Sequence, residues 1–131
     1  IIEGSRVNNI QTVLIVKDSH VCAKSLAKSI ERLGKEYTIV ENGQLAVDEI
    51  EQNPEKYDLI FMDNIMPVMK GGEAAEKIRE LKYVNPIIGL TGNLLQEDVD
   101  EFLKSGANKV IGKPFNFNTI KLLFEELECI K

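Results

Sequence analysis

The sequence has few of the features that mark disulfide-rich, metal-binding or membrane proteins. Its only two cysteines, Cys22 and Cys129, lie far apart and form no C-x-x-C pair, so neither a disulfide framework nor a zinc site is indicated. No apolar run approaches the roughly 20 residues that cross a bilayer, and no signal-peptide pattern is present. These absences predict a soluble cytoplasmic domain with two reduced thiols.

Basic residues are not in excess. The chain has 16 Lys and Arg against 21 Asp and Glu, a net charge of −5, and its lysines and arginines are scattered. Because nucleic-acid phosphates bind basic faces, this balance argues against nucleic acid as a direct partner.

The length sets the domain organisation. A chain of 131 residues has room for one domain, and 44% hydrophobic with 28% charged residues is the composition of a globular protein. The chain opens at Ile1 rather than Met, which indicates a processed or excised piece. We expect residues 1–11 to be an N-terminal linker or cloning remnant and residues 12–131 to form the domain.

What the sequence does contain is a fivefold alternation of short apolar runs and longer amphipathic stretches. This alternation is typical of β-α units that build a parallel sheet. The runs are continuously apolar, as expected of parallel strands buried on both faces. The predicted strands are Thr12–Val16, Tyr37–Val40, Tyr57–Met62, Pro86–Leu90 and Asn108–Ile111.

Apolar residues recur every three to four positions between these runs, which predicts amphipathic helices packed on the sheet. Gly34 and Gly106 are expected as helix C-terminal stops, and Asn42 and Asn116 as N-caps. The stripes interpreted as core are Ala23, Leu26, Ala27, Ile30 and Leu33; Ala46, Val47 and Ile50; Ala74, Ala75, Ile78 and Leu81; Leu95, Val99, Phe102 and Leu103; and Ile120, Leu123, Phe124, Leu127 and Ile130.

Four apolar runs end at residues that carry chemistry. Asp63 follows the third run, while Asp18, Thr91 and Lys113 stand just past the first, fourth and fifth. Right-handed crossovers put the carboxyl ends of parallel strands on one edge, where an open sheet binds its ligand. We therefore expect these four side chains to converge.

Such a set has the parts needed to accept a phosphoryl group and hold it. Asp63 would attack phosphorus and carry an acyl phosphate. Asp18 and Asp63, with the backbone carbonyl of Ile65, would hold Mg²⁺, which offsets repulsion between nucleophile and donor. Lys113 would contact one phosphoryl oxygen and Thr91 another.

Four ordered blocks resemble a known family, and the match runs from about Thr12 to the C-terminus. They are VLIVKD at 13–18, DLIFMDNIMPVMKG at 58–71, GLTGN at 89–93 and GANKVIGKPF at 106–115. This pattern resembles the receiver domain of response regulators. The resemblance implies an α/β, flavodoxin-like fold with strand order 2-1-3-4-5, an aspartyl phosphate on Asp63, and a phospho-histidine protein as donor. It also makes Asp18 a metal ligand, Thr91 the switch hydroxyl and Lys113 the phosphate-binding lysine.

Lys17 departs from the family pattern, because receivers usually carry two adjacent acidic residues after the first strand. Lys17 and Lys113 against Asp18 and Asp63 give a formally neutral site, where an acid at position 17 would give −2. A unit charge about 4 Å away is worth roughly 4 kcal/mol at an effective dielectric of 20. We predict weakened Mg²⁺ binding, with Lys17 either turned into solvent or lying inside and partly substituting for the cation.

Two other departures concern output and the loop after Asp63. Val110 stands where the family often places an aromatic switch residue, which puts rotamer-coupled output in doubt and leaves a loop shift driven by Thr91 and Lys113. Lys70 replaces the usual Asp of the loop and is interpreted as exposed.

Further candidates flank the predicted site. His20, the only histidine, is expected to be an exposed first-turn residue rather than a phosphorylated one. Val21 and Cys22 could dock a helical phosphotransfer partner or be partly buried against the next loop. Ile65 places an apolar side chain at a position where an amide would orient water, so we expect slow loss of the phosphoryl group.

The leading interpretation is a phosphorelay receiver, acting as a relay or cut from a hybrid sensor histidine kinase, with a histidine kinase or histidine phosphotransfer protein as partner. No turnover is expected beyond its own phosphorylation and dephosphorylation, and no membrane contact.

One alternative, motivated by Lys17, is an interaction module that is not phosphorylated. An aspartyl-phosphate hydrolase would need Asp-x-Asp after the first strand, where Ser19 and His20 follow Asp18. A flavin carrier would need a Ser/Thr/Gly-rich phosphate loop there.

Overall fold

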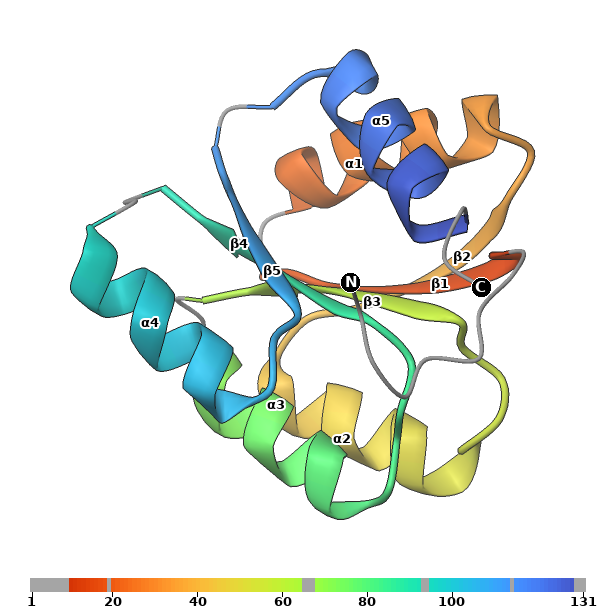
Figure 1. Ribbon diagram of the computed structural model, residues 1–131. Helices are drawn as coiled ribbons and strands as arrows, with labels where there is room; N and C mark the ends of the chain where they lie inside the picture. Colours follow the sequence, from red (N-terminus) through yellow and green to blue (C-terminus); the bar gives the residue numbers. More distant parts are fainter. Residues whose placement is uncertain (1–9, 19, 65–67, 93–94, 114, 129–131) are drawn as a thin grey trace.

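Strands and helices alternate along the chain and build one parallel sheet with helices on both faces. The computed structural model describes residues 10–18, 20–64, 68–92, 95–113 and 115–128. Within these residues five strands pair in the order β2-β1-β3-β4-β5 (Figure 1). The predicted flavodoxin-like fold and strand order are confirmed.

The strands lie close to their predicted positions, but three of them end later than predicted. They are β1 Thr12–Val16, β2 Glu36–Val40, β3 Leu59–Asp63, β4 Ile87–Thr91 and β5 Lys109–Gly112. The predictions stopped at the last apolar residue, whereas a strand continues as long as its backbone hydrogen bonds do. Asn64 N–H still donates to Leu90 O at 3.0 Å, so Asp63 belongs to β3 itself.

Continuous burial holds for the three inner strands only. β3 and β4 are buried throughout, and β1 from its second residue on. The prediction was wrong for β2 and β5, whose residues are half-buried or exposed. These two strands form the edges of the sheet, where one side of each strand has no neighbouring strand.

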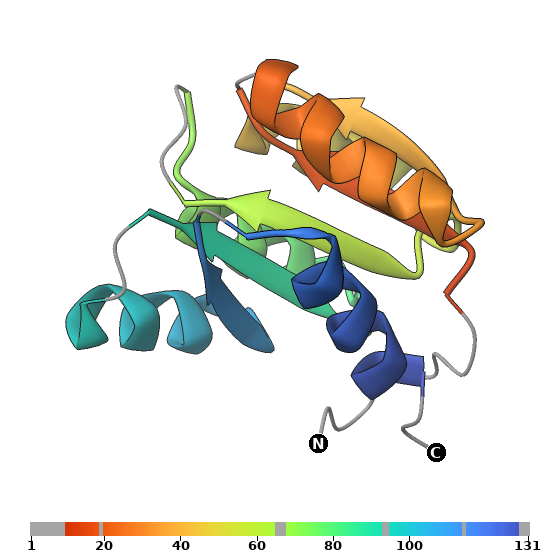
Figure 2. The ribbon, with the colours of Figure 1, turned by 90° about the horizontal axis from the view of Figure 1, so that it is seen from above.

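The helices cover the sheet in two unequal sets. α1 and α5 lie on one face, and α2, α3 and α4 on the other (Figures 1 and 2). Their bounds are α1 His20–Arg32, α2 Gly43–Gln52, α3 Gly71–Glu80, α4 Gln96–Ser105 and α5 Phe117–Glu128. Each face has its own buried cluster, because alternate residues of a strand point to opposite faces. None of the helices in the described part is long and apolar enough to cross a bilayer.

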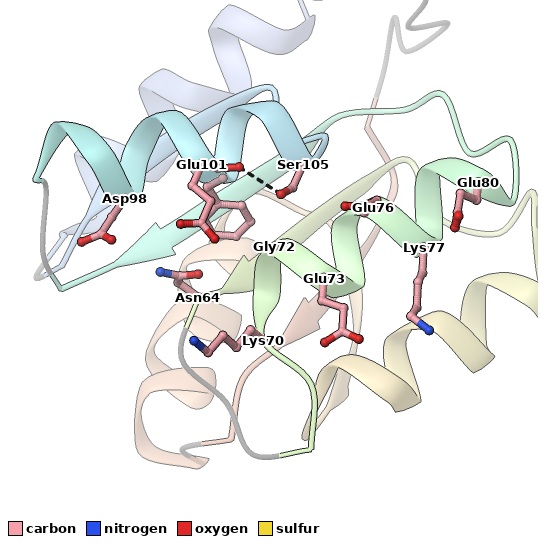
Figure 3. A pocket seen from close by; sticks show the side chains of 11 residues that line it. Asn64, Lys70, Gly72, Glu73, Glu76, Lys77, Glu80, Asp98, Glu101 and Ser105 are labelled. Atoms are coloured by element: carbon pink, nitrogen blue, oxygen red, sulfur yellow. Dashed lines mark hydrogen bonds between the residues drawn. The ribbon is translucent and has the colours of Figure 1, made fainter.

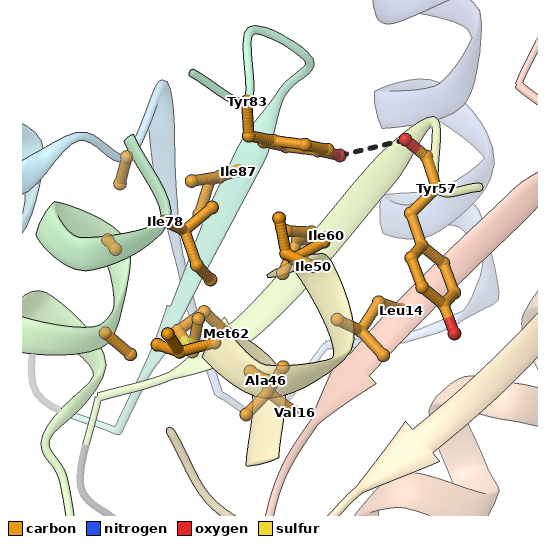
Figure 4. Packing of buried hydrophobic residues seen from close by; sticks show 14 of the residues in the cluster. Leu14, Val16, Ala46, Ile50, Tyr57, Ile60, Met62, Ile78, Tyr83 and Ile87 are labelled. Atoms are coloured by element: carbon orange, nitrogen blue, oxygen red, sulfur yellow. Dashed lines mark hydrogen bonds between the residues drawn. The ribbon is translucent and has the colours of Figure 1, made fainter. Parts of the chain in front are cut away.

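The cluster on the α2, α3 and α4 face contains two tyrosines, Tyr57 and Tyr83, and Figure 4 shows the Tyr83 hydroxyl directed at the carbonyl oxygen of Tyr57. Tyr83 donates to the carbonyl oxygen of Tyr57 at 3.2 Å, and Tyr57 donates to Glu49 Oε2 at 2.6 Å. Burial and the bond to Glu49 raise the pKa of Tyr57 to about 12, and burial raises the pKa of Tyr83 as well. Both hydroxyls therefore stay neutral across the physiological range.

The helix ends follow the predicted caps. Asn42 Oδ1 accepts from Leu45 N–H at 2.9 Å, and Asn116 Oδ1 accepts from Thr119 N–H at 3.0 Å. Gly106 directly follows α4 with a φ of +130°, a conformation that favours glycine. Gly34, two residues past α1, has a φ of +77°.

The predicted core stripe of α4 was wrong at two of its four positions. Leu95 is 60% exposed and Leu103 39%, and within α4 only Phe102 is buried. A Cβ added at Gly89 would lie 2.7 Å from the Phe102 ring, so this ring packs directly on the backbone of β4. One aromatic side chain thus makes the contact with the sheet, and the leucines on either side stay near the surface.

Packing begins before the first strand. Ile10, within the expected linker, is fully buried, and its N–H donates to Glu128 Oε2 at 2.9 Å. Of the helix-face residues predicted as core, Ile130 lies outside the described residues.

Candidate functional site

The strand register brings residues from distant parts of the chain to one edge of the sheet. β1 and β3 pair Val16 with Met62, so the next residues, Lys17 and Asp63, lie side by side. On the other side of β3, Asp63 pairs with Leu90, and β4 then pairs Thr91 with Gly112. The carboxyl ends of β1, β3, β4 and β5 therefore meet around Asp63.

Asp63 is buried, and each of its carboxylate oxygens accepts from a different lysine. Lys17 Nζ lies 3.2 Å from Oδ2, and Lys113 Nζ lies 3.1 Å from Oδ1. The Asp63 side chain is only 6% exposed. Charge-assisted bonds of this kind are shorter and stronger than neutral ones and fix the orientation of the carboxylate.

The sequence left two positions open for Lys17, turned into solvent or inside the site. The structure has it inside. Its side chain is 1% exposed, and its backbone N–H donates to Val40 O at 3.1 Å, which prolongs the β1–β2 ladder. A buried ammonium is costly unless an anion compensates it. Asp63 is the compensating anion, and this explains why Lys17 does not turn outward.

Lys113 and Thr91 are linked through the backbone. Lys113 N–H donates to Thr91 O at 2.7 Å, which ties the loop after β5 to the end of β4. Thr91 is buried, whereas the Lys113 side chain is 30% exposed. Lys113 thus reaches Asp63 from the solvent side, and Lys17 reaches it from within.

Asp18 follows Lys17 directly in the chain but, unlike Lys17 and Asp63, it is exposed. The described residues contain no group of three or more His, Cys, Asp or Glu positioned to hold a metal ion. The Ile65 carbonyl, predicted as a third ligand, lies outside the described residues, as do the side chains of His20, Val21 and Cys22.

Gly71 is a site residue that the sequence indicated only as part of the family motif. A Cβ at this position would overlap the carbonyl oxygen of Asp63, and Gly71 N–H donates to Asn64 O at 2.9 Å. The start of α3 therefore packs directly on the backbone of the acidic residue. The Lys-Gly-Gly sequence at the helix start was the available signal.

Two further residues depart from the family pattern, Val110 and Lys70. Val110 is partly buried against the cluster on the α2, α3 and α4 face. Lys70 is exposed, as expected.

A polar hollow of about 440 Å³ lies beside the site, between α3 and α4 (Figure 3). It contains neither Asp63 nor the two lysines that contact it, and only Asn64 joins it to the site. Its acidic lining consists of Glu73, Glu76, Glu80, Asp98 and Glu101. These carboxylates are the solvated faces of two neighbouring helices, so we place the functional site at Asp63.

The fold and the site together define a doubly wound α/β domain built around one buried carboxylate at the carboxyl edge of its sheet. The chain belongs to the response regulator receiver domain family, whose sequence model matches residues 13–125.

Curated relatives come from fungi, plants and bacteria. The transcription factor SKN7 of Candida albicans is 36% identical over 103 residues, which cover 79% of this chain and 18% of that protein. The two-component response regulator ORR41 of Oryza sativa subsp. japonica is 33% identical over 106 residues, covering 79% of this chain and 84% of that protein. The autoinducer 2 sensor kinase/phosphatase LuxQ of Vibrio vulnificus is 38% identical over 103 residues, covering 78% and 12%. The chain spans less than a fifth of the SKN7 proteins that it matches.

Solved structures of receiver domains have the same fold as this chain. The receiver domain of sensor histidine kinase PA1611 from Pseudomonas aeruginosa PAO1, with a magnesium ion in its active-site cleft, has a TM-score of 0.82 and 32% identity, covering 93% of this chain and 100% of that one. The Ssk1 receiver domain of Saccharomyces cerevisiae, crystallised with the histidine phosphotransfer protein Ypd1, has a TM-score of 0.84 and 30% identity, covering 92% and 90%. The chain is thus a receiver domain of the kind used in two-component and phosphorelay signalling.

Proposed function

We propose that this domain accepts a phosphoryl group from a phospho-histidine protein onto Asp63. The observation that carries the proposal is the Asp63 carboxylate, buried at the sheet edge with one ammonium on each oxygen. A carboxylate held in a fixed position is an oriented nucleophile. The two lysines lie where negative charge would gather during transfer.

The transfer is a single displacement at phosphorus. A bond forms between an Asp63 oxygen and phosphorus, while the bond between phosphorus and the donor imidazole nitrogen breaks. The electron pair of that bond leaves with the imidazole. Lys113 serves as the phosphate-binding lysine and the Thr91 hydroxyl as a hydrogen-bond partner for the phosphoryl group.

A histidine kinase or a histidine phosphotransfer protein is the proposed donor. Support comes from the Ssk1 receiver, which was crystallised with such a phosphotransfer protein. The net charge of −5 favours a protein partner over nucleic acid. Docking next to Val21 and Cys22 stays a prediction from the sequence, as does the cytoplasmic location.

The role of the parent protein is also a proposal. The match to LuxQ supports a receiver within a hybrid sensor kinase, and the match to ORR41 supports a phosphorelay component. The alternative, a module that is not phosphorylated, gains no support from these comparisons.

Magnesium is generally bound by receiver domains, and Asp18 and Asp63 are the residues of this chain that would hold it. The present arrangement does not fit a divalent cation well. Both Asp63 oxygens already accept hydrogen bonds from ammonium groups, and Asp18, the other carboxylate that would bind the cation, is exposed. We therefore propose that Mg²⁺ binds more weakly here than where an acid replaces Lys17.

Phosphotransfer from a phosphorylated histidine phosphotransfer protein tests the proposed function. After mixing, intact-protein mass spectrometry should show one added phosphoryl group on the wild type and none on Asp63→Asn. Circular dichroism of the variant serves as the folding control. Equal modification of the two proteins would contradict the assignment of Asp63.

A further inference from the structure

We infer that the Lys17 ammonium takes the place of the divalent cation in this domain, so that Asp63 accepts a phosphoryl group without Mg²⁺. The inference rests on the proposed function and extends it to how the site balances charge. It is carried by the contact between a buried ammonium and the carboxylate oxygen Oδ2.

Lys17 is fixed in place rather than drawn in from the surface. Its backbone continues the β1–β2 ladder through Val40, and the register of β1 with β3 sets it beside Asp63. The side chain is 1% exposed, so its charge is poorly screened by solvent. A fixed and poorly hydrated positive charge is what a bound cation would otherwise supply.

The charge count supports the same conclusion. The three side chains in contact, Lys17, Lys113 and Asp63, carry two positive charges and one negative charge. With the exposed Asp18 counted as well, the site is formally neutral. An anionic phosphoryl donor therefore meets no net negative charge, although the attacking group is an anion. In a site with an acid at position 17 the same three positions would be net negative, and an external cation would be needed to offset the repulsion.

Lys17 and a metal ion would compete for the same oxygen. Because Oδ2 accepts from Lys17, a cation bound there would have to displace the ammonium or lie next to it against charge repulsion. Asp18, the next residue in the chain, is exposed, and a single carboxylate is by itself a poor site for a cation that prefers six oxygen ligands.

The step needs no further reactant. With acetyl phosphate as donor, an Asp63 oxygen forms a bond to phosphorus, the bond from phosphorus to the bridging oxygen breaks, and its electron pair leaves with acetate. Lys17 transfers no proton and acts as a charged hydrogen-bond donor throughout.

The test compares phosphorylation rates in excess chelator and in millimolar Mg²⁺. Acetyl phosphate is the donor, and mass spectrometry follows the modified fraction of wild type, Lys17→Asp and Lys121→Met. Lys121 is exposed on α5, so Lys121→Met provides a control for the removal of a surface ammonium. Binding of Mn²⁺, a paramagnetic substitute for Mg²⁺, is measured separately from its line broadening in NMR spectra.

We expect the wild type and Lys121→Met to react at rates that differ by less than about threefold between the two conditions, and Lys17→Asp to slow by at least about tenfold in chelator. Lys17→Asp should also bind Mn²⁺ more tightly than the wild type. A wild type that slows tenfold or more in chelator would overturn the inference but leave the proposed function intact, and this comparison needs no variant. A wild type that is modified in neither condition, nor by a phospho-histidine protein, would overturn both.

Discussion

Lys17 and Asp63 form a buried ion pair because β1 and β3 place them side by side, one residue beyond the pair Val16 and Met62. Neither side chain has much access to water, with exposures of 1% and 6%. Each buried charge is therefore stabilised by the other, and Asp63 also by Lys113. Breaking the pair should lower the free energy of unfolding of the domain.

A double-mutant cycle measures the coupling energy between Lys17 and Asp63. Asp63→Asn leaves the Lys17 ammonium buried without a carboxylate, and we expect a loss of about 3 kcal/mol in the free energy of unfolding. Adding Lys17→Met should recover much of that loss, giving a coupling energy on the order of 1–3 kcal/mol by urea denaturation.

The control for this cycle is an exposed pair of the same chemistry. Lys109 and Glu126 lie 3.0 Å apart with side chains 46% and 58% exposed. Their coupling should be below about 1 kcal/mol, because solvent screens exposed ion pairs. A Lys17–Asp63 coupling no larger than that of the control would mean that the buried contact does not exist in solution.

Gly71→Ala should destabilise the domain and disturb the site. The added methyl group would overlap the carbonyl oxygen of Asp63, a backbone atom that cannot turn away. We expect a loss of about 1–3 kcal/mol and slower phosphorylation. Gly72→Ala is the matched control, since its Cβ would lie 3.2 Å from the Ser105 hydroxyl oxygen, which can rotate. Equal stabilities of the two variants would contradict the close approach of α3 to Asp63.

The contact between Gly89 and Phe102 allows a similar comparison at the α4 face. Gly89→Ala would push a methyl group into the Phe102 ring and should cost about 1–3 kcal/mol. Phe102→Leu in the same chain should relieve part of that cost. At Gly92 a Cβ would have nothing within 4 Å, so Gly92→Ala should be close to neutral. Failure of the second substitution to relieve the first would argue against this packing.

Alkaline pH should weaken the fold through the buried tyrosines. The folded pKa of Tyr57, about 12, and the raised pKa of Tyr83 exceed the usual value of 10.0. The stabilisation is therefore complete below pH 10 and is lost as pH rises from 10 through 12. Tyr83→Phe removes one ionising group and should reduce the slope of unfolding free energy against pH by up to about 1.4 kcal/mol per unit. An unchanged slope would show that Tyr83 is not buried.

Much of the fold and part of the site could be predicted from the sequence. Five short apolar runs separated by amphipathic stretches predicted the sheet and its helices, because this alternation is typical of parallel β-α units. Burial on both faces held only for the three inner strands. The exposure of Leu95 and Leu103 could not be predicted, since spacing alone does not tell how one large ring will fill a contact. The position of Lys17 stayed open for a different reason. It depends on the register between β1 and β3, which pairs residues 46 positions apart.

The most direct test is to locate the phosphoryl group. Borohydride reduces an acyl phosphate of aspartate to homoserine, so the wild type is phosphorylated, reduced, digested and sequenced by tandem mass spectrometry. We expect homoserine at position 63 and at no other aspartate. Homoserine at Asp18, or a phosphoryl group found on His20 with Asp63 unmodified, would contradict it.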